Sequence, residues 1–226
     1  MNRKAMRDYT LLLADEFDVE ESEGLFNAEN LNVLINISKN KTTLDLAYGV
    51  PKKFRKIKLI DITANQRVYS IAADLLITDF LDFQDILQNV SGKRATPLIE
   101  IDADDEWRYE DLDELTYWGW EDKDSIFIGK TATSTVVSRL KSYYTAELPD
   151  LTKDSDEPAM PKVCHPLISI DVLKQFTLAD EGSLNKVELY YQKELLNVIN
   201  KLSTKSNFVY SGQKPSVKEV LASRDA

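Results

Sequence analysis

The sequence predicts an α+β fold, mainly helical, in which a bundle of N- and C-terminal helices carries a β-rich insertion between them and an extended tail follows. Three observations predict this class. Apolar residues repeat at helical spacing towards both ends of the chain, short runs rich in Ile, Val and Tyr occupy the middle, and prolines gather where the second helical part begins. The predicted parts are residues 1–50 (N-terminal helices), 51–150 (β-rich insertion), 151–205 (C-terminal helices) and 206–226 (extended tail).

Two helices are expected before the insertion. Met6, Tyr9 and Leu13 follow the i, i+3, i+7 spacing of one helix face, and Gly24 interrupts the pattern. A second helix is predicted over about 27–48, although polar residues at 40–43 weaken the pattern in its middle. Both segments are therefore assigned to the N-terminal part of the bundle.

The middle of the chain changes to β-type runs after Pro51. The expected strands cover Phe54–Ile62, Arg67–Ala72, Ser125–Ile128 and Thr135–Tyr144. In the last run Val136, Leu140 and Tyr144 share one face, which predicts that this face is buried. Residues 63–66 read as a turn in which Asn65 tolerates a positive φ. Because strands do not alternate with helices, a parallel βαβ architecture is not expected.

A proline-rich loop separates the insertion from the last helices, since proline continues neither helices nor strand ladders. Its prolines are Pro149, Pro158, Pro161 and Pro166. Pro166 suits the first turn of a helix that is expected to end near Gly182. Ser183 is the predicted N-cap of the following helix, whose apolar face runs from Val187 to Leu202.

Composition excludes several classes of protein. The chain has 226 residues and one cysteine, so it forms no internal disulfide. No apolar run approaches the about 20 residues that span a bilayer, and no apolar segment follows the basic residues near the N-terminus, so neither a membrane span nor a signal peptide is expected. We therefore expect no membrane partner and a cytosol-like compartment.

The net charge of −10 is concentrated between Glu100 and Asp124. DNA wrapping requires Lys and Arg to neutralise phosphates, so this acidic stretch disfavours such a role, and no basic patch is expected elsewhere. Asp102, Asp104, Glu106 and Asp113 echo the spacing of an EF-hand calcium loop, but Trp107 occupies the position that requires glycine. A solvated acidic surface is the default interpretation.

No residue pattern points to catalysis. Cys164 and His165 are the conventional candidates, but adjacent side chains point in different directions and Pro166 restricts the backbone further. The aromatic residues at 117–120 could stack on bases or sugars, although packing in a core or interface is favoured. With 7 glycines the chain has no glycine-rich phosphate loop. We expect no enzyme activity, no metal site and no cofactor.

Two phrases carry a resemblance to a known family. The first is Ile62–Ile71 (ITANQRVYSI), a turn followed by a strand that contains Tyr. The second is Tyr143–Thr152 (YYTAELPDLT), followed by Asp156, Glu157 and Pro158. Together with the order of elements, they resemble the bacteriophage head-to-tail adaptor family, also called head completion or connector-ring proteins. The resemblance covers roughly 27–202.

The resemblance implies a structural subunit of a connector ring of about twelve copies that docks below the portal protein, joins the DNA-filled head to the tail and forms part of the DNA channel. The implied partners are the portal, neighbouring copies, the next tail or neck ring and passing DNA without specific binding, and the implied location is the neck of a virion assembled in the host cytoplasm. Acidic residues would line the channel, where negative charge keeps DNA from adhering: Asp102, Asp104, Asp105, Glu106, Glu110 and Asp111.

The tail after residue 205 has apolar anchors but too little length to bury them alone. We expect it to bind the portal through Phe208, Val209, Tyr210, Val217, Val220 and Leu221. Three alternatives stay open. One is a ring lower in the tail tube that acts as a gatekeeper, another is a small acidic inhibitor or DNA mimic, and the last is a sugar- or metal-dependent enzyme with a site near Trp118 or the acidic stretch.

Overall fold

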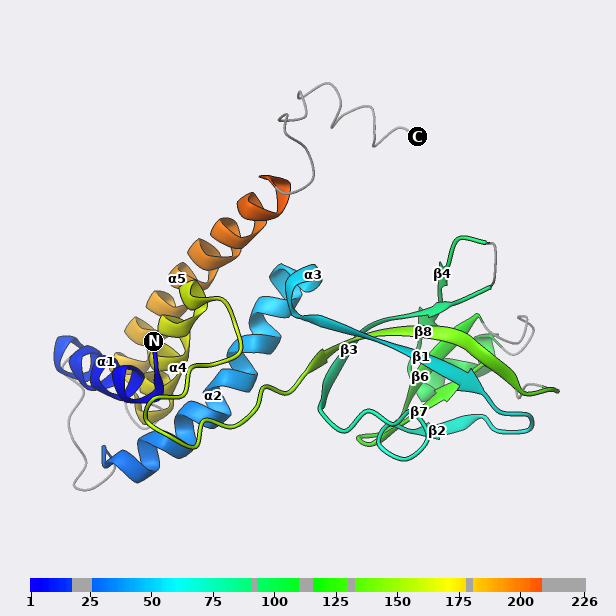
Figure 1. Ribbon diagram of the computed structural model, residues 1–226, viewed down its shortest axis with the longest axis horizontal. Helices are drawn as coiled ribbons and strands as arrows, with labels where there is room; N and C mark the ends of the chain where they lie inside the picture. Colours follow the sequence, from blue (N-terminus) through cyan, green and yellow to red (C-terminus); the bar gives the residue numbers. More distant parts are fainter. Residues whose placement is uncertain (18–25, 91–92, 110–115, 130–132, 178–180, 209–226) are drawn as a thin grey trace. The chain divides into compact units, whose positions relative to one another are not determined.

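The computed structural model describes residues 1–17, 26–90, 93–109, 116–129, 133–177 and 181–208 (Figure 1). Helices and strands are both present, which confirms the α+β class. The chain divides into two compact units. The helical unit comprises Met1–Val50 and the chain from Pro149 onward, and the β-rich unit comprises Pro51–Leu148. The boundary therefore lies before Pro149 and not after Asp150.

Four helices form the helical unit, in the part of the chain that the structure describes: α1 (Arg3–Glu16), α2 (Ala28–Gly49), α4 (His165–Phe176) and α5 (Glu181–Phe208). The short 3₁₀ helix η2 (Lys162–Cys164) leads into α4. Asn2 and Asn27 cap α1 and α2, because each side-chain oxygen accepts a hydrogen bond from a backbone N–H of the first turn. Pro166 lies in the first turn of α4, as predicted.

α4 is the central helix of this unit and contacts α1, α2 and α5. Its position explains why it is the most apolar of the four, with one buried residue following another from Leu167 to Leu173. An apolar cluster joins it to α1, to α2 and to the loop that follows the β-rich unit: Met6, Leu31, Ile35, Leu151, Ile168 and Val172. Burial of such side chains stabilises the fold by about 1.5–3 kcal/mol each.

The boundaries of the last two helices differ from the predictions. α4 ends at Phe176 and not near Gly182: Thr177 is its C-cap, with a non-helical backbone and a β-branched side chain of low helix propensity. α5 begins at Glu181, so Ser183 lies inside the first turn and its predicted N-cap role is wrong. α5 also continues to Phe208, so residues 206–208 are helical and not extended, since no Gly or Pro interrupts the helix there.

The β-rich unit contains two four-stranded sheets among the described residues. The first sheet has the order β1-β8-β3-β4, with β1 (Arg55–Ile62), β8 (Val136–Ala146), β3 (Phe80–Gln88) and β4 (Thr96–Pro97). The second has the order β2-β7-β6-β5, with β2 (Val68–Ser70), β7 (Ser125–Ile128), β6 (Tyr117–Asp122) and β5 (Ile99–Glu100). Described neighbours are antiparallel except β5 and β6. Two short helices, α3 (Pro51–Phe54) and η1 (Ala103–Tyr109), complete the unit.

The two sheets pack face to face around one apolar core. Its members come from both sheets and the loops between them: Ile60, Ile62, Tyr69, Ile71, Leu75, Ile77, Phe83, Ile86, Leu98, Trp118, Ile126, Ile128, Leu140, Tyr144 and Ala146. The favoured core role of the aromatic segment is confirmed for Tyr117 and Trp118, which are almost fully buried. Glycine is required at the next position, Gly119, because a Cβ there would overlap the Ile101 carbonyl oxygen and the Phe127 ring.

The predicted turn before β2 is confirmed. Asn65 has a φ of 61°. The Tyr69 hydroxyl accepts a hydrogen bond from the Thr63 N–H at 3.1 Å and donates to the Gln66 carbonyl at 3.2 Å. Burial raises the pKa of Tyr69, so the hydroxyl keeps its proton and continues to donate. One buried ring therefore fixes both ends of the turn.

The buried face predicted for β8 holds over most of the strand. Leu140 and Tyr144 are buried, but Val136 is 38% exposed. Ser138 adopts a φ of 52°, and the register to β1 shifts next to it, so the alternation of faces is broken before Val136. The Ser138 N–H instead donates to the Asp61 carboxylate at 2.6 Å.

Candidate functional site

The six residues predicted to line a channel fall into three groups. Asp102 and Asp104 are exposed at the start of η1. Asp105 and Glu106 are only partly exposed. Glu110 and Asp111 lie outside the described residues. Among the described members, only Asp102 and Asp104 are exposed.

Glu106 fastens η1 to the second sheet. Its carboxylate forms an ion pair with Arg67 and accepts a hydrogen bond from the Tyr117 hydroxyl at 3.2 Å. The Arg67 guanidinium also lies 5.2 Å from the centre of the Phe127 ring. Apolar packing of Tyr109 on Tyr117 adds to the attachment. Glu106 therefore has a structural role that its position in an acidic run does not reveal.

Most of the predicted portal-binding tail lies outside the described residues. Phe208 is the last residue of α5, and its backbone is helical. Val209, Tyr210, Val217, Val220 and Leu221 belong to the part of the chain that the structure does not describe. The tail interaction stays a prediction.

The outward surface of the first sheet carries a set of apolar and basic side chains that was not predicted from the sequence. We call this surface, formed by Arg55, Ile57 and Leu59 of β1 with Lys141 and Tyr143 of β8, the outer sheet face. Ile57 and Leu59 are 53% and 48% exposed. Arg55 and Lys141 lie 4.2 and 5.1 Å from the centre of the Tyr143 ring, so the two cations flank an aromatic side chain.

Basic residues continue from this face into α3. Lys52 and Lys53 are exposed, and the run from Lys52 to Lys58 holds five basic and no acidic residues. The expectation of no basic patch is therefore wrong, and the run PKKFRKIK was a sufficient sequence signal. Lys56 is held in an ion pair with Asp79, which raises the pKa of Lys56 and lowers that of Asp79.

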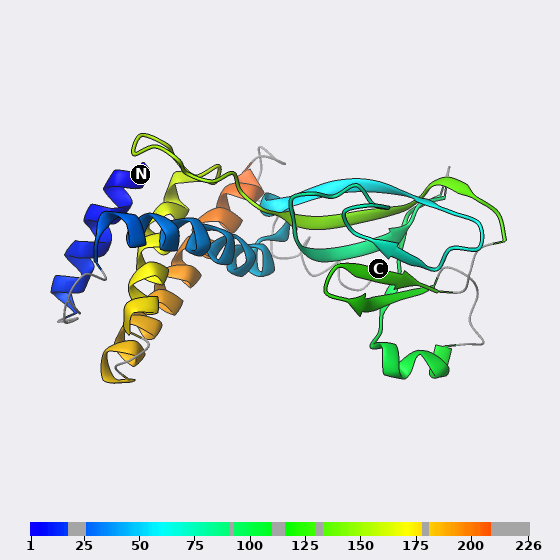
Figure 2. The same cartoon turned by 90° about the horizontal axis from the view of Figure 1, so that it is seen from below.

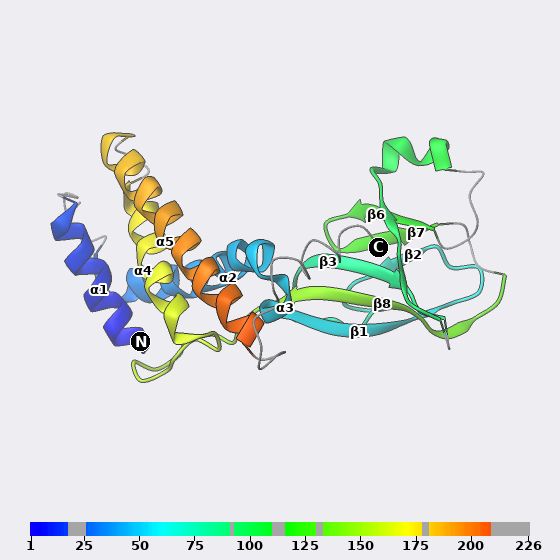
Figure 3. The same ribbon diagram turned by 90° about the horizontal axis from the view of Figure 1, so that it is seen from above.

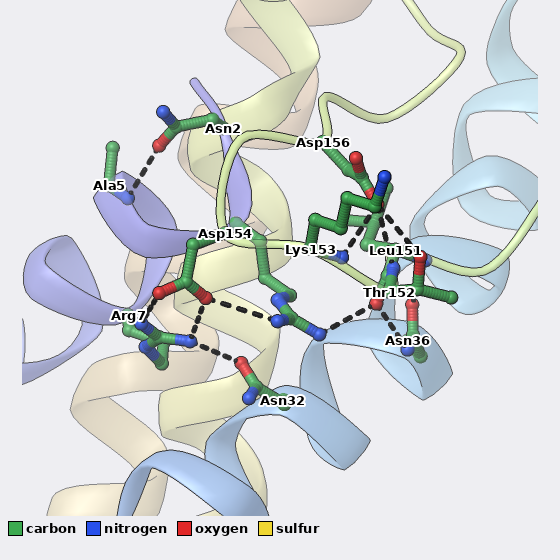
Figure 4. Close-up of polar contacts among 11 residues, drawn as sticks. Asn2, Ala5, Arg7, Asn32, Asn36, Leu151, Thr152, Lys153, Asp154 and Asp156 are labelled. Atoms are coloured by element: carbon green, nitrogen blue, oxygen red, sulfur yellow. Dashed lines mark hydrogen bonds and ion pairs between the residues drawn. The ribbon is translucent and has the colours of Figure 1, made fainter.

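A polar network fixes the loop that enters the helical unit (Figure 4). Asp154 accepts hydrogen bonds from Arg3 at 3.1 Å and from Arg7 at 2.7 and 2.9 Å. Arg7 also donates to the Asn32 side-chain oxygen at 2.6 Å. The two guanidinium groups lower the pKa of Asp154 to about 2.

The same loop is fixed on α2 as well. The Asn36 side-chain oxygen accepts from the Leu151 N–H at 2.9 Å, and the Leu151 carbonyl accepts from Arg3 at 2.9 Å. Asp156 closes a turn by accepting from the N–H groups of Thr152 and Lys153 at 2.8 and 2.7 Å (Figure 4). This network is a structural joint, because its hydrogen bonds attach the loop to α1 and α2.

Charged groups are also enclosed within the helical unit. The Lys39 ammonium is fully buried and donates to Asp150 at 2.6 Å and to the Asn36 carbonyl at 3.3 Å. The fully buried Asp171 accepts from Lys41 at 2.8 Å. These pairs satisfy buried charges, which would otherwise be costly.

Cys164 and His165 are not arranged as a nucleophile and base. Burial raises the pKa of the Cys164 thiol to about 12, so the reactive thiolate is not formed near neutral pH. His165 is 1% exposed, with Nε2 3.1 Å from the Met160 carbonyl and Nδ1 2.6 Å from the Met1 amino group. Both ring nitrogens are engaged with other groups.

Across the described ranges, no group of three or more His, Cys, Asp and Glu side chains is placed to hold a metal ion. No described helix is long and apolar enough to cross a membrane.

A scan of known family models finds no match to this chain, and a search of curated proteins finds no similar sequence.

Proposed function

We propose that this chain is a structural subunit of a bacteriophage connector ring that docks below the portal and joins the DNA-filled head to the tail. The observation that carries the proposal is the two-unit organisation, in which helices from both ends of the chain share one unit and the strands lie in another. A helical bundle with a β-rich insertion is the architecture that the resemblance implies. The chain is then a scaffold for contacts with other proteins and has no catalytic role.

The two phrases that carry the resemblance coincide with structural joints. Ile62–Ile71 contains the turn held by Tyr69 and strand β2. Tyr143–Thr152 runs from β8 into the loop fixed on α1 and α2 by Arg3 and Asn36. Such joints set the geometry of a fold, so their likeness to a family supports the proposal more than scattered identities would.

Acidic residues on η1 suit a channel wall in this proposal. Asp102 and Asp104 are exposed, so their charge reaches the solvent. Negative charge on a hydrated wall repels the phosphates of passing DNA and keeps the duplex from adhering. Neighbouring copies, about twelve in a closed ring, would place these carboxylates around one circumference.

The tail supplies the portal contact in this proposal. Six apolar residues fall within and just before the last 18 positions: Phe208, Val209, Tyr210, Val217, Val220 and Leu221. Each could contribute roughly 1.5–3 kcal/mol if buried against a partner. Binding would offset the conformational entropy lost when the segment becomes ordered.

Assembly on portal rings tests the proposal. The full chain is mixed with purified portal protein encoded by the same phage, and masses are measured by mass photometry alongside negative-stain images. We expect a largely monomeric chain that forms a stacked ring on the portal. A matched variant that ends at Phe208 should keep its helical circular dichroism and lose most portal binding.

Other outcomes would favour the alternatives. Binding to a tail-tube protein without binding to the portal would place the ring lower in the tail. A monomer that ignores both rings but inhibits a basic nucleic-acid enzyme would replace the proposal with an acidic DNA mimic, which the net charge of −10 also suits.

A further inference from the structure

We propose that neighbouring copies of this chain join through their helical units, with an acidic face of α1 in one copy docking on a basic face of α5 in the next. This inference rests on the proposed ring, for which it names the subunit contact. The contact uses neither the η1 carboxylates assigned to the channel wall nor the tail assigned to the portal.

The acidic α1 face consists of four exposed residues on one side of that helix. They are Asp8, Leu11, Leu12 and Asp15, which fall at positions i, i+3, i+4 and i+7 and therefore share a face. Leu11 and Leu12 are 38% and 61% exposed. The buried residues of α1 lie on its other side, so this face points away from the helical unit.

Acidic charge dominates this side of α1. Besides Asp8 and Asp15, its exposed charged residues are Lys4, one turn before, and Glu16, directly after. Three carboxylates therefore accompany one ammonium group. The arginines of α1 donate to Asp154 on a different side of the helix.

The basic α5 face has the same layout with the opposite charge. Its residues are Lys186, Leu189, Lys193 and Leu196, which fall at positions i, i+3, i+7 and i+10 and are all exposed. Leu189 and Leu196 are 72% and 60% exposed. Two leucines and two cations therefore alternate along the outward side of α5.

The carboxylates of this part of α5 lie elsewhere on the helix. Between residues 185 and 200 they are Glu188 and Glu194. Glu188 pairs with Lys174 of α4 at 2.7 Å, and Glu194 lies near Tyr190, whose ring contacts Phe17 of α1. Both therefore lie on sides of α5 that meet other helices of the same copy, and the outward face keeps its positive charge.

The two faces lie on different sides of the helical unit. The Ser169 hydroxyl of α4 donates to the Met6 carbonyl of α1 at 3.1 Å, whereas Lys174 of α4 pairs with α5. Five residues turn a helix by about 140°, so α1 and α5 pack on well-separated sides of α4. Figures 2 and 3 show α1 and α5 on different sides of α4. Each face points away from α4 and is open to a neighbouring copy.

The two faces match in spacing as well as in charge. Asp8 and Asp15 are seven residues apart, which is about 10.5 Å along the helix axis. Lys186 and Lys193 have the same separation. When the two helices lie side by side, both ion pairs therefore form at once, and the exposed leucines between the charges pack against each other.

A second copy is the occupant that this match selects. Contact between two α1 faces would place carboxylates on carboxylates, and contact between two α5 faces would place ammonium groups together. α2 also exposes Val33 and Ile37, but its single exposed carboxylate, Glu29, matches only one of the two lysines. Because the two faces are unlike and point apart, their contact is heterologous, and each copy keeps a face for the next neighbour, as a closed ring requires.

Cysteine cross-linking tests the contact in the full chain. The native Cys164 is fully buried, so an introduced surface cysteine is the main target of a short bismaleimide. Leu11→Cys marks the acidic α1 face, and Asn185→Cys, exposed one turn before Leu189, marks the basic α5 face. At low salt and high protein concentration, we expect cross-linked dimers from the mixture of the two variants and few from either variant alone.

Two further mixtures keep Asn185→Cys and change its partner. Lys123→Cys, whose native side chain is 89% exposed in the β-rich unit, is the control and should give few dimers. Ile37→Cys tests the exposed apolar residues of α2 as the alternative partner and should also give few. The same mixtures are then cross-linked on portal rings, where copies are held next to one another.

Charge exchange tests the chemistry of the contact. Asp8→Lys with Asp15→Lys in the α1 cysteine variant, or Lys186→Glu with Lys193→Glu in the α5 cysteine variant, should each lower the yield roughly tenfold or more, because like charges then face each other. Mixing the two charge-reversed proteins restores opposite charges at the cross-linked contact and should restore the yield. Far-ultraviolet circular dichroism checks that each variant is folded.

Several results would overturn the inference. Efficient cross-links within a single variant would show a symmetric contact, efficient cross-links to Ile37→Cys would move the partner to α2, and equal yields after charge reversal would remove the electrostatic basis. Absence of mixed cross-links both in solution and on portal rings would reject the contact, while ring formation on the portal would leave the proposed function intact. Duplex DNA binding that is lost in the Lys186→Glu and Lys193→Glu protein, without mixed cross-links, would assign the α5 face to nucleic acid.

Discussion

Removing the partner of a buried ammonium group should destabilise the helical unit. Lys39 is fully buried on α2, whereas 72% of its partner Asp150 is exposed. Breaking a wholly buried ion pair by deleting one member costs roughly 3–5 kcal/mol. Water reaches the Asp150 side of this pair, so we expect Asp150→Ala to lower the free energy of unfolding by about 2 kcal/mol.

The loss of stability in Asp150→Ala should come from the unpaired, buried Lys39 ammonium and not from the missing carboxylate. Lys39→Met removes the buried charge, leaves Asp150 hydrated and takes one donor from the Asn36 carbonyl, so it should cost only about 1 kcal/mol. The double variant should then be as stable as Lys39→Met and more stable than Asp150→Ala. This non-additivity separates the pair from two independent effects.

Urea unfolding followed with two spectroscopic probes shows which of the two units is destabilised. All three tryptophans, Trp107, Trp118 and Trp120, belong to the β-rich unit, so their fluorescence reports that unit. Helical circular dichroism reports mainly the helical unit, where the shift is expected. Glu157→Ala, which breaks an ion pair between exposed side chains, is the matched control and should leave the midpoint unchanged. The reasoning fails if Asp150→Ala unfolds like the wild type or if Lys39→Met does not rescue it.

Three further outcomes follow from the described contacts. Gly119→Ala should lower the unfolding free energy by about 2 kcal/mol or more, measured by tryptophan fluorescence in urea, because the Ile101 backbone cannot move aside easily; a smaller loss would show that it can. The Arg7 and Arg3 contacts lower the pKa of Asp154 to about 2, so their stabilisation is complete above its unfolded pKa near 4 and is lost as pH falls towards 2. Asp154→Asn should therefore differ from wild type in melting temperature at pH 7 and converge with it at low pH, and a constant difference would contradict this. Cys164 should react with a thiol reagent only after denaturation, and rapid labelling of the native chain would oppose its burial.

Local signals predicted much of the fold. The polar residues at 40–43 did not break α2, because Thr42 and Thr43 are buried within the unit and the Thr43 hydroxyl donates to the Lys39 carbonyl at 2.7 Å. Asn65 was identified as a residue with positive φ because few residue types tolerate that conformation. Both predictions depended on residues close together in the chain.

Strand β3 was not predicted from the sequence, because it is defined by pairing with a strand that is distant in the chain. Its register to β8 shifts near Phe80 and again near Phe83, so its burial does not follow simple alternation, and no period-2 pattern is visible. β5 and β4 are too short to produce any pattern. Pairing with distant strands defines these elements, and a single sequence does not contain that information locally.

The polar joint around Asp154 shows the same limit. The side chains that hold the loop, Arg3, Arg7 and Asn36, come from two helices at the other end of the chain. Nothing in the loop itself distinguishes Asp154 from an ordinary solvated carboxylate. The basic run at 52–58 differs, because it is visible in the sequence even though the net charge of the chain is −10.

The division of the helical unit between the two ends of the chain has a consequence for synthesis. Leu31 and Ile35 leave the ribosome long before their partners Ile168 and Val172, which are made only after the whole β-rich unit. The β-rich unit, whose first and last strands pair through Arg55 and Thr145, has all its strands as soon as β8 emerges. We therefore expect the insertion to fold first during translation, while α1 and α2 present unpaired apolar faces that chaperones can recognise until α4 arrives.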